Sequence, residues 1–303
     1  MKKILALGLL ISVLLSACAT TPSNQEPVDL ANKTINVSVS IPPIEWLVRQ
    51  IGADKIQVQS LTVSGDDPHT YEPSPSQMAS LAKADLFLTV GVEFENVWVP
   101  RFLDANKNLQ VFDISEGVMR LPTPSGHIHE GEAEAAGLDE EGLDPHIWLS
   151  PSNMELLAAN TAAILTDFDQ TNADFYQTKL NQLLEVIKDT DAKIHQLLDQ
   201  PARAEFLILH PALGYLAHEY GLEMIPVEIE GQEPSPAQMA EILEFSIEYG
   251  ITTLFVQKGS NPLNVQSLAD QTKIESVIEI DPMAYDWDTN ILAISEALSE
   301  AIN

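Results

Sequence analysis

Three histidines and one aspartate stand at widely separated positions, each in a local context that suits a metal ligand. His69 and His146 each follow an Asp-Pro pair, His210 follows the apolar run Phe206-Leu207-Ile208-Leu209, and Asp281 follows Val277-Ile278-Glu279-Ile280. The chain has only seven histidines, so three in such settings are a large share. Zinc is borderline-soft and accepts nitrogen and oxygen donors in a tetrahedron, so three imidazoles and one carboxylate suit it well.

Each of these residues also has a simpler interpretation. A loop histidine such as His69 is commonly just solvated, and His210, directly after an apolar run, fits a buried core histidine. Asp281 stands before Pro282 and fits a cap or turn residue. The four together favour a shared site, because all fall at or just beyond the expected carboxyl ends of strands, or in loops on that side, where ligands bind in open α/β sheets.

The elements that must position these residues are short strands and helices in alternation. The expected strands cover residues 35–41, 56–63, 86–90, 206–209, 224–229, 253–257 and 277–280. A helix is expected over 75–83, between the second and third of these strands. Strand, helix and strand in this order predict the α/β class with parallel sheets.

An internal repeat indicates two related lobes. The segment Glu-Pro-Ser-Pro-Ser-Gln-Met-Ala at 72–79 recurs almost unchanged at 233–240. In each copy a serine (Ser74 or Ser235) fits the N-cap of a helix, the next proline fits the first helical position, and a glutamine closes a capping box. A chance recurrence of common capping chemistry is the weaker explanation.

A long amphipathic pattern over 171–198 predicts one helix of roughly 40 Å between the lobes, at 1.5 Å per residue. It contains no glycine or proline and is therefore expected to be stiff. The predicted organisation is an N-terminal lobe over 34–170, a linking helix over 171–199 and a C-terminal lobe over 200–303. Each lobe supplies two of the four candidate ligands, which places the metal in the cleft between them.

The N-terminus carries an export signal. Lys2 and Lys3 precede an apolar run over 4–15 that is too short to span a bilayer. Leu-Ser-Ala-Cys at 15–18 resembles the bacterial lipobox, so residues 1–17 are expected to be a lipoprotein signal peptide and Cys18 the lipidated residue. An ordinary secretory signal with an incidental cysteine is the alternative. Residues 18–33 predict a flexible tether.

The composition is strongly acidic, with 45 Asp and Glu against 15 Lys and Arg and a net charge of −30. Such a surface repels nucleic acid, so no nucleic-acid partner is expected. The segment 122–142 is acidic, contains His127 and His129, and lacks apolar periodicity. A role in collecting zinc and a plain solvated linker both fit this segment.

Three motifs carry a resemblance to a known family. They are Asp-Pro-His-Thr-Tyr-Glu-Pro-Ser-Pro at 67–75, Asp-Pro-His-Ile-Trp-Leu-Ser-Pro at 144–151 and Glu-Ile-Glu-Gly-Gln-Glu-Pro-Ser-Pro at 228–236. With them the chain resembles, from about residue 34 to 303, the zinc/manganese solute-binding lipoproteins of bacterial ABC transporters (ZnuA/TroA-like). The resemblance implies two (β/α) sandwich lobes joined by a rigid helix, with one metal ion between them.

The resemblance also implies a site and partners. Carried over by motif, the metal ligands are His69, His146, His210 and Asp281. The implied partners are an ABC permease and its ATPase, with a monomeric chain held outside the cytoplasm on the membrane by the lipid on Cys18. Manganese-preferring members tend to carry Glu where His210 stands, so zinc is the expected cargo, and a manganese-binding importer component is the alternative.

Glu228 and Glu230 are candidates for groups that orient a ligand imidazole, and both also fit a solvated loop edge.

Two other functions are alternatives to metal import. A zinc hydrolase would need an open metal position, but the chain contains neither His-Glu-x-x-His nor Gly-x-Ser-x-Gly. An adhesin-type lipoprotein stabilised by its metal is the other alternative, and it would need no transporter partner.

Overall fold

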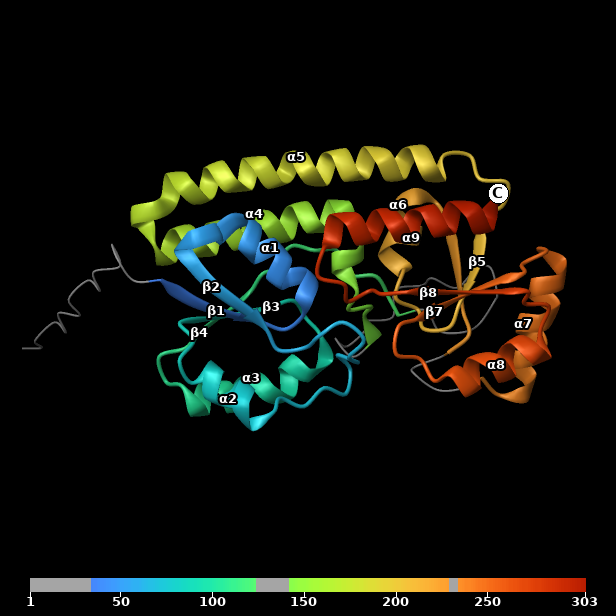
Figure 1. The fold of residues 1–303 in the computed structure, drawn as a ribbon, viewed down its shortest axis with the longest axis horizontal. Coiled ribbons are helices and arrows are strands. Elements are labelled where there is room, and N and C mark those ends of the chain that lie inside the picture. The colour runs from blue at the N-terminus through green and yellow to red at the C-terminus, as the bar shows by residue number, and fades with distance from the viewer. Residues whose placement is uncertain (1–33, 124–141, 229–233) are drawn as a thin grey trace, which may run out of the picture.

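The computed structural model describes residues 34–123, 142–228 and 234–303. Several predicted features lie outside these residues: the signal peptide, Cys18 and its tether, His127, His129 and Glu230. The described chain alternates strands and helices and forms two separate parallel sheets (Figure 1). The predicted α/β class is therefore confirmed.

The first sheet has the strand order β2–β1–β3–β4, with all neighbours parallel. Its strands are β1 (Ile35–Val39), β2 (Ile56–Ser60), β3 (Leu86–Thr89) and β4 (Gln110–Asp113). The first three lie in predicted ranges and end slightly earlier than expected. The sequence does not predict β4, because an edge strand that reads Gln-Val-Phe-Asp has neither a continuous apolar run nor a clean alternation.

The second sheet repeats this order as β6–β5–β7–β8, again with parallel neighbours. Its strands are β5 (Glu205–Ile208), β6 (Glu223–Pro226), β7 (Thr253–Gln257) and β8 (Ser276–Ile280). All four occupy predicted strand regions. The same order in both sheets means that the carboxyl ends of equivalent strands carry equivalent loops, which is where the candidate ligands were expected.

The internal repeat marks the same point in both halves. Helix α2 (Pro75–Leu81) lies between β2 and β3, and α7 (Pro236–Glu248) lies between β6 and β7. Ser74 and Ser235 are their N-caps, and each closes a capping box with the glutamine three residues later. The predicted helix starts are thus confirmed, and both arise from local chemistry that needs no tertiary contact.

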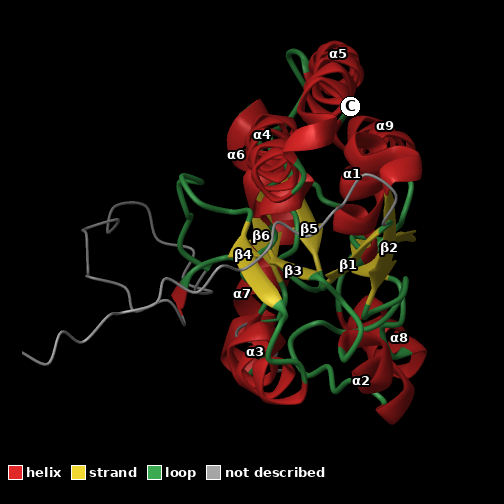
Figure 2. Cartoon of the chain, turned by 90° about the vertical axis from the view of Figure 1, so that its left-hand side faces the viewer, coloured by secondary structure: helices red, strands yellow, loops and turns green. Residues whose placement is uncertain are grey.

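Helices cover both faces of the sheets (Figures 1 and 2). One layer contains α1 (Pro42–Gly52), α4 (Pro151–Phe168), α5 (Ala173–Leu198), α6 (Gly214–Tyr220) and α9 (Trp287–Ile302). The opposite layer contains α2, α3 (Glu93–Ala105), α7 and α8 (Pro262–Gln271). Each sheet is therefore the middle of a three-layer sandwich, which buries the apolar residues of its central strands on both faces.

The long helix α5 follows the predicted span closely, with 26 residues and no break. Its buried stripe includes Tyr176, Leu180, Leu183, Ile187, Ile194 and Leu198. The final helix α9 packs along α5, and the Ser299 hydroxyl donates to the Leu197 carbonyl (2.8 Å). Two helices therefore run along the layer that both halves share, whereas the sequence predicts only one.

The largest apolar cluster extends across both halves, because it contains residues of β1 and β3 as well as Phe206 of β5 and Trp287 of α9. A smaller cluster packs around β6 and β7. The predicted domain limits at residues 170 and 199 stay a prediction. No helix in the described ranges is long and apolar enough to cross a membrane.

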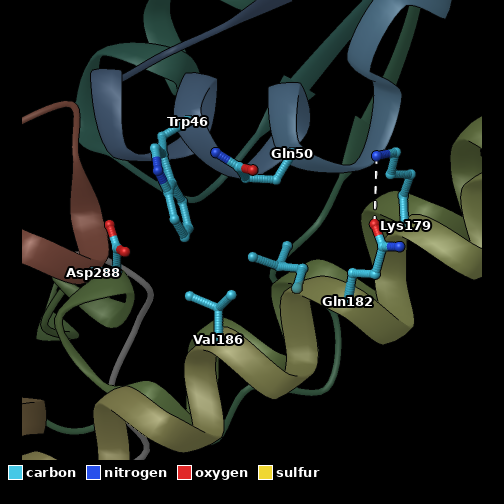
Figure 3. Close-up of a pocket in the computed structure, with 7 residues that line it drawn as sticks. Trp46, Gln50, Lys179, Gln182, Val186 and Asp288 are labelled. Carbon is cyan, nitrogen blue, oxygen red and sulfur yellow. Dashed lines mark hydrogen bonds between the residues drawn. The ribbon is translucent and has the colours of Figure 1, made fainter.

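A surface pocket lies between α1 and α5, next to the start of α9 (Figure 3). It is lined by Trp46, Gln50, Lys179, Gln182, Leu183, Val186 and Asp288. Lys179 donates to Gln182 at its rim (3.4 Å). None of the candidate ligands lines this pocket, because they lie in the loops at the strand ends.

Candidate metal centre

Three of the four predicted ligands meet at one point. His69 lies in the loop between β2 and α2, His146 lies directly before the short 3-10 helix η3 (Ile147–Leu149), and His210 follows β5. The Nε2 atom of His210 is 3.3 Å from that of His69 and 3.4 Å from that of His146. One ring nitrogen from each residue lies within 4.8 Å of the others, and this is the spacing of donors around a single ion.

A carboxylate faces the outer nitrogen of each ring. The Nδ1 atom of His69 is 2.9 Å from Glu93, that of His146 is 2.7 Å from Asp144, and that of His210 is 3.8 Å from Glu228. The first two distances are hydrogen bonds, and the third is an ion-pair distance. A carboxylate that accepts from Nδ1–H leaves the Nε2 lone pair free, which is the tautomer that a metal needs.

The His146 position is buried and doubly held. His146 is 5% exposed and Asp144 is 2% exposed. Asp144 Oδ1 accepts from both the backbone nitrogen of His146 (2.9 Å) and its ring. The Trp148 ring lies beside the imidazole, with centroids 5.4 Å apart. The Asp-Pro-His sequence therefore contains the orienting carboxylate, Asp144, as well as the candidate ligand, His146. The site predicted from the sequence includes only His146.

The His69 position uses its own aspartate differently. Asp67 Oδ1 accepts from the backbone nitrogen of His69 (2.9 Å), but Oδ2 accepts from the hydroxyl of Thr70 (2.9 Å). The ring turns instead to Glu93, the first residue of α3. Glu93 is missing from the sequence-based site. Its only signal is an acidic residue that opens a helix after a buried strand at the same sheet edge.

The pKa values of His69 and His210 are shifted in opposite directions. Burial lowers the pKa of His69, but the hydrogen bond to Glu93 and the charge of Glu93 outweigh burial, so the net shift is upward. For His210 the net pKa shift is downward, and burial is its largest cause. The nearby Glu228 carboxylate raises the pKa by less than burial lowers it, and repulsion by the other two histidines lowers it further. His210 therefore stays neutral to lower pH than His69.

Asp281, the predicted fourth ligand, lies outside the histidine group found among the described residues. Its Oδ2 atom accepts from the Ser64 hydroxyl (2.5 Å) and from the ammonium of Lys258 (3.3 Å). Its Oδ1 atom accepts from the backbone nitrogen of Met283 (3.0 Å). The Asp281 carboxylate thus has a cationic partner, Lys258, that the sequence does not predict. The role of Asp281 as a ligand stays a prediction.

Of the two predicted orienting glutamates, Glu228 is described and Glu230 is not. Glu228 follows β6, and its backbone nitrogen donates to the carbonyl of Leu209, beside His210 (2.9 Å). This contact brings its carboxylate to the ring of His210. The donor set as a whole, three imidazoles with carboxylates behind them, fits a divalent ion of borderline softness such as zinc.

Comparisons with known proteins point the same way. A family model described as the periplasmic component A of a zinc-uptake complex, ZnuA, matches residues 37–301. The chain is 27% identical over 272 residues to the high-affinity zinc uptake system protein ZnuA of Bacillus subtilis (strain 168), covering 86% of this chain and 82% of the relative. It is 28% identical over 288 residues to the zinc-binding lipoprotein AdcA of Streptococcus pneumoniae (strain ATCC BAA-255 / R6), covering 93% of this chain but only 54% of AdcA.

Solved structures share the fold. A crystal structure of ZnuA matches with a TM-score of 0.80 at 30% identity, over 89% of this chain and 100% of that chain. A zinc-bound deletion mutant of ZnuA matches with a TM-score of 0.81 at 30% identity, over 89% and 99%. The laminin-binding protein Lmb of Streptococcus agalactiae matches with a TM-score of 0.75 at 24% identity, over 89% and 100%, and this likeness shows the fold alone.

Proposed function

The chain belongs to the family of periplasmic zinc-uptake complex components, and from this premise we propose that it is the zinc-binding component of an ABC importer, working outside the cytoplasm. The family is a solute-binding component of transport and not an enzyme, so zinc is its cargo. The function is capture of Zn²⁺ between the two halves and its delivery to a permease.

The observation that carries this proposal is the convergence of three Nε2 atoms, each on a ring whose Nδ1 faces a carboxylate. We assign His69, His146 and His210 as ligands and Asp281 as the fourth. Three neutral imidazoles and one carboxylate would complete a tetrahedral shell without an open position, which suits holding an ion rather than activating water. Glu93, Asp144 and Glu228 would orient the rings and raise their basicity.

Binding in this site is coupled to protons. Each imidazole must be neutral to donate its lone pair, so zinc replaces protons on any ring that carries one. The downward pKa shift of His210 keeps that ring neutral, whereas the upward pKa shift of His69 makes it gain a proton at higher pH than His210 does. Acidification therefore weakens the proposed capture, at His69 before His210.

The cellular setting is a finer part of the proposal. We place a lipid on Cys18, which would hold the chain on the membrane through the segment 18–33, and assign the permease and ATPase of an ABC importer as partners of a monomeric chain. Support comes from the lipobox-like sequence at 15–18 and from the lipoprotein name of the relative AdcA. Retention of the protein with membranes, and its release by Cys18→Ala, would test the anchor.

The site is tested by metal titration of the soluble chain without residues 1–18. The measurement is competition for zinc with a coloured chelator, for the native sequence, His210→Ala and His195→Ala. His195 is a matched control, because it is a 63% exposed histidine that pairs with Asp191 on α5, outside the three-histidine group.

We expect one zinc per chain, with affinity about 100-fold weaker in His210→Ala, since removing one of four ligands eliminates a direct metal bond. His195→Ala should bind as the native sequence does. Preference for manganese, or equal zinc affinity in the two alanine variants, would contradict the proposal.

A further inference from the structure

A polar bridge connects the two halves through Asp281, the proposed fourth ligand. Ser64 lies in the loop after β2, Lys258 directly follows β7, and Asp281 directly follows β8. The ammonium of Lys258 donates to the Ser64 hydroxyl (2.7 Å) and to Asp281 Oδ2 (3.3 Å), and the Ser64 hydroxyl donates to the same Oδ2 (2.5 Å). Two side chains, from two loops, therefore share one carboxylate oxygen of Asp281 in a third loop.

The backbone brings these loops together closely. Gly65 and Gly259 both have positive φ, at 88° and 90°. A Cβ on Gly259 would lie 2.8 Å from the carbonyl oxygen of Gly65, which no side chain could tolerate without a shift of the backbone. The contact is thus built into the chain by two adjacent residue pairs, Ser64-Gly65 and Lys258-Gly259.

The bridge engages the Asp281 oxygen that accepts from side chains and not from the backbone. Its Oδ1 atom is used by the backbone nitrogen of Met283, in the turn that follows β8. Its Oδ2 atom is held only by side chains, both of which can rotate away. If Asp281 is the fourth ligand, an incoming cation would take Oδ2, and the positive ammonium of Lys258 would be its direct competitor.

We propose that Lys258 competes with Zn²⁺ for Asp281 Oδ2, so that metal binding exchanges one cation for another and breaks the bridge to Ser64. This inference rests on the proposed function, because it needs Asp281 as a ligand. The competition lowers zinc affinity below what the four ligands alone would give. Return of Lys258 to Asp281 would ease release of the ion when the permease receives it.

The expected size of the effect is modest. The Lys258 side chain is 47% exposed and that of Asp281 is 17% exposed, so water screens part of their attraction. Ion pairs of this exposure contribute little, and removing the competing ammonium should strengthen zinc binding about twofold to fivefold. A merely structural bridge predicts the opposite, because its loss would loosen the site and weaken binding.

The first experiment measures zinc affinity by chelator competition for the native sequence, Lys258→Met, Asp281→Asn and the double variant. Lys258→Met should bind more tightly, and the same change should have no effect when Asp281 is already Asn. Lys273→Met is the matched control, an exposed lysine whose loss should leave the affinity unchanged. Equal or weaker binding by Lys258→Met, or an undiminished gain in the Asn background, would overturn the inference.

The second experiment uses the native sequence and therefore does not depend on a variant. A brief pulse of an amine-acylating reagent, read by mass spectrometry, reports how freely each lysine reacts with and without zinc. Lys258 should be acylated faster when zinc is bound, because it has lost its carboxylate partner. The acylation rate of Lys273 should not change. An unchanged or slower Lys258 would overturn the competition.

The two proposals fail differently. Absence of zinc binding by the native sequence would overturn both the proposed function and this inference. One tightly bound zinc, with no gain in Lys258→Met and no change in Lys258 reactivity, would overturn only the inference.

Discussion

Two segments of the chain have a similar order of residue types but lie in different surroundings. The segments 67–75 and 144–151 each begin Asp-Pro-His, carry an aromatic residue two positions later, and end in Ser-Pro at the start of a helix. Ser74 and Ser150 are the N-caps of α2 and α4, and both accept from the backbone nitrogen three residues later. The local structure of the two segments is therefore alike.

Their tertiary contacts differ. The segment 144–151 is buried and tied to the second half: Trp148 Nε1 donates to the Pro282 carbonyl (2.8 Å) and Trp287 Nε1 donates to the Trp148 carbonyl (2.7 Å). The aromatic residue of the segment 67–75, Tyr71, is half-buried and donates to Leu61 of its own half (2.5 Å). That region meets the second half at the rings of His69 and His210 and at the exposed bridge from Ser64 to Lys258.

The same motif therefore holds one candidate ligand firmly and the other loosely. His146 is held by its hydrogen bond to Asp144 and by the neighbouring Trp148 ring, both in buried surroundings. His69 relies on Glu93, which is about half exposed, and on a loop held by a polar bridge. We call the segment 144–151 the firm wall of the site and the segment 67–75 its adjustable wall. A site with one wall of each kind can bind an ion tightly and still open on one side.

The two aspartates provide the strongest test of this difference. Asp144→Asn removes the charge behind His146 in a buried setting, and we expect zinc affinity to fall about 10- to 100-fold, as for other carboxylates that orient a metal-bound histidine. Asp67→Asn changes an exposed turn residue whose hydrogen bonds go to the backbone of His69 and to Thr70, and we expect a loss of less than about threefold. Chelator competition measures both. Equal losses would remove the distinction between the segments.

The two aromatic residues test the same difference in stability. Trp148→Phe keeps a ring but leaves the buried Pro282 carbonyl without its indole donor, which should cost about 1–3 kcal/mol in the free energy of unfolding. Tyr71→Phe should cost less than about 1 kcal/mol, since the Leu61 carbonyl also accepts from Gln77 and stays paired. Urea denaturation of the metal-free proteins measures both. A larger loss in Tyr71→Phe would contradict the assignment of the firm wall.

The parts of the fold and site that the sequence predicts are those set by local chemistry. The capping boxes at Ser74 and Ser235, the stripe of α5 and the three histidines all have signals within a few residues. The partner of His69 does not, because Glu93 is 24 residues away and reaches the ring only once β3 and α3 are in place. The contact of Asp281 with Ser64 is further beyond prediction, since it joins residues 217 apart.

The carboxylate behind His69 gives a third test. Glu93→Gln keeps a hydrogen-bond acceptor for Nδ1 but removes the charge, and we expect zinc affinity at pH 8 to fall about tenfold or less, a smaller loss than for Asp144→Asn because Glu93 is partly solvated. Glu155→Gln, a change to a half-buried glutamate on α4 with no part in the site, is the control. A loss in Glu93→Gln as large as that in Asp144→Asn would make both walls equally firm.

The smallest expected effect is a shift in pH dependence. Because the pKa of His69 is raised above 6.5, a proton competes with zinc on that ring at higher pH than on an ordinary histidine, and the affinity of the native protein should begin to fall above this value. In Glu93→Gln the pKa of His69 should drop, since burial then acts without the opposing charge, and the fall in affinity should move to lower pH.

The control for this shift is Glu228→Gln, which removes the carboxylate facing His210. Its onset of zinc loss should match that of the native protein, because the pKa of His210 is already lowered and His69 gains a proton at higher pH than His210. Competitive titrations between about pH 5 and pH 8 bracket the ordinary pKa of histidine and would resolve the three curves. If Glu228→Gln shifts the onset and Glu93→Gln does not, the ring that first gains a proton is His210, and the adjustable wall must be sought on the other side of the site.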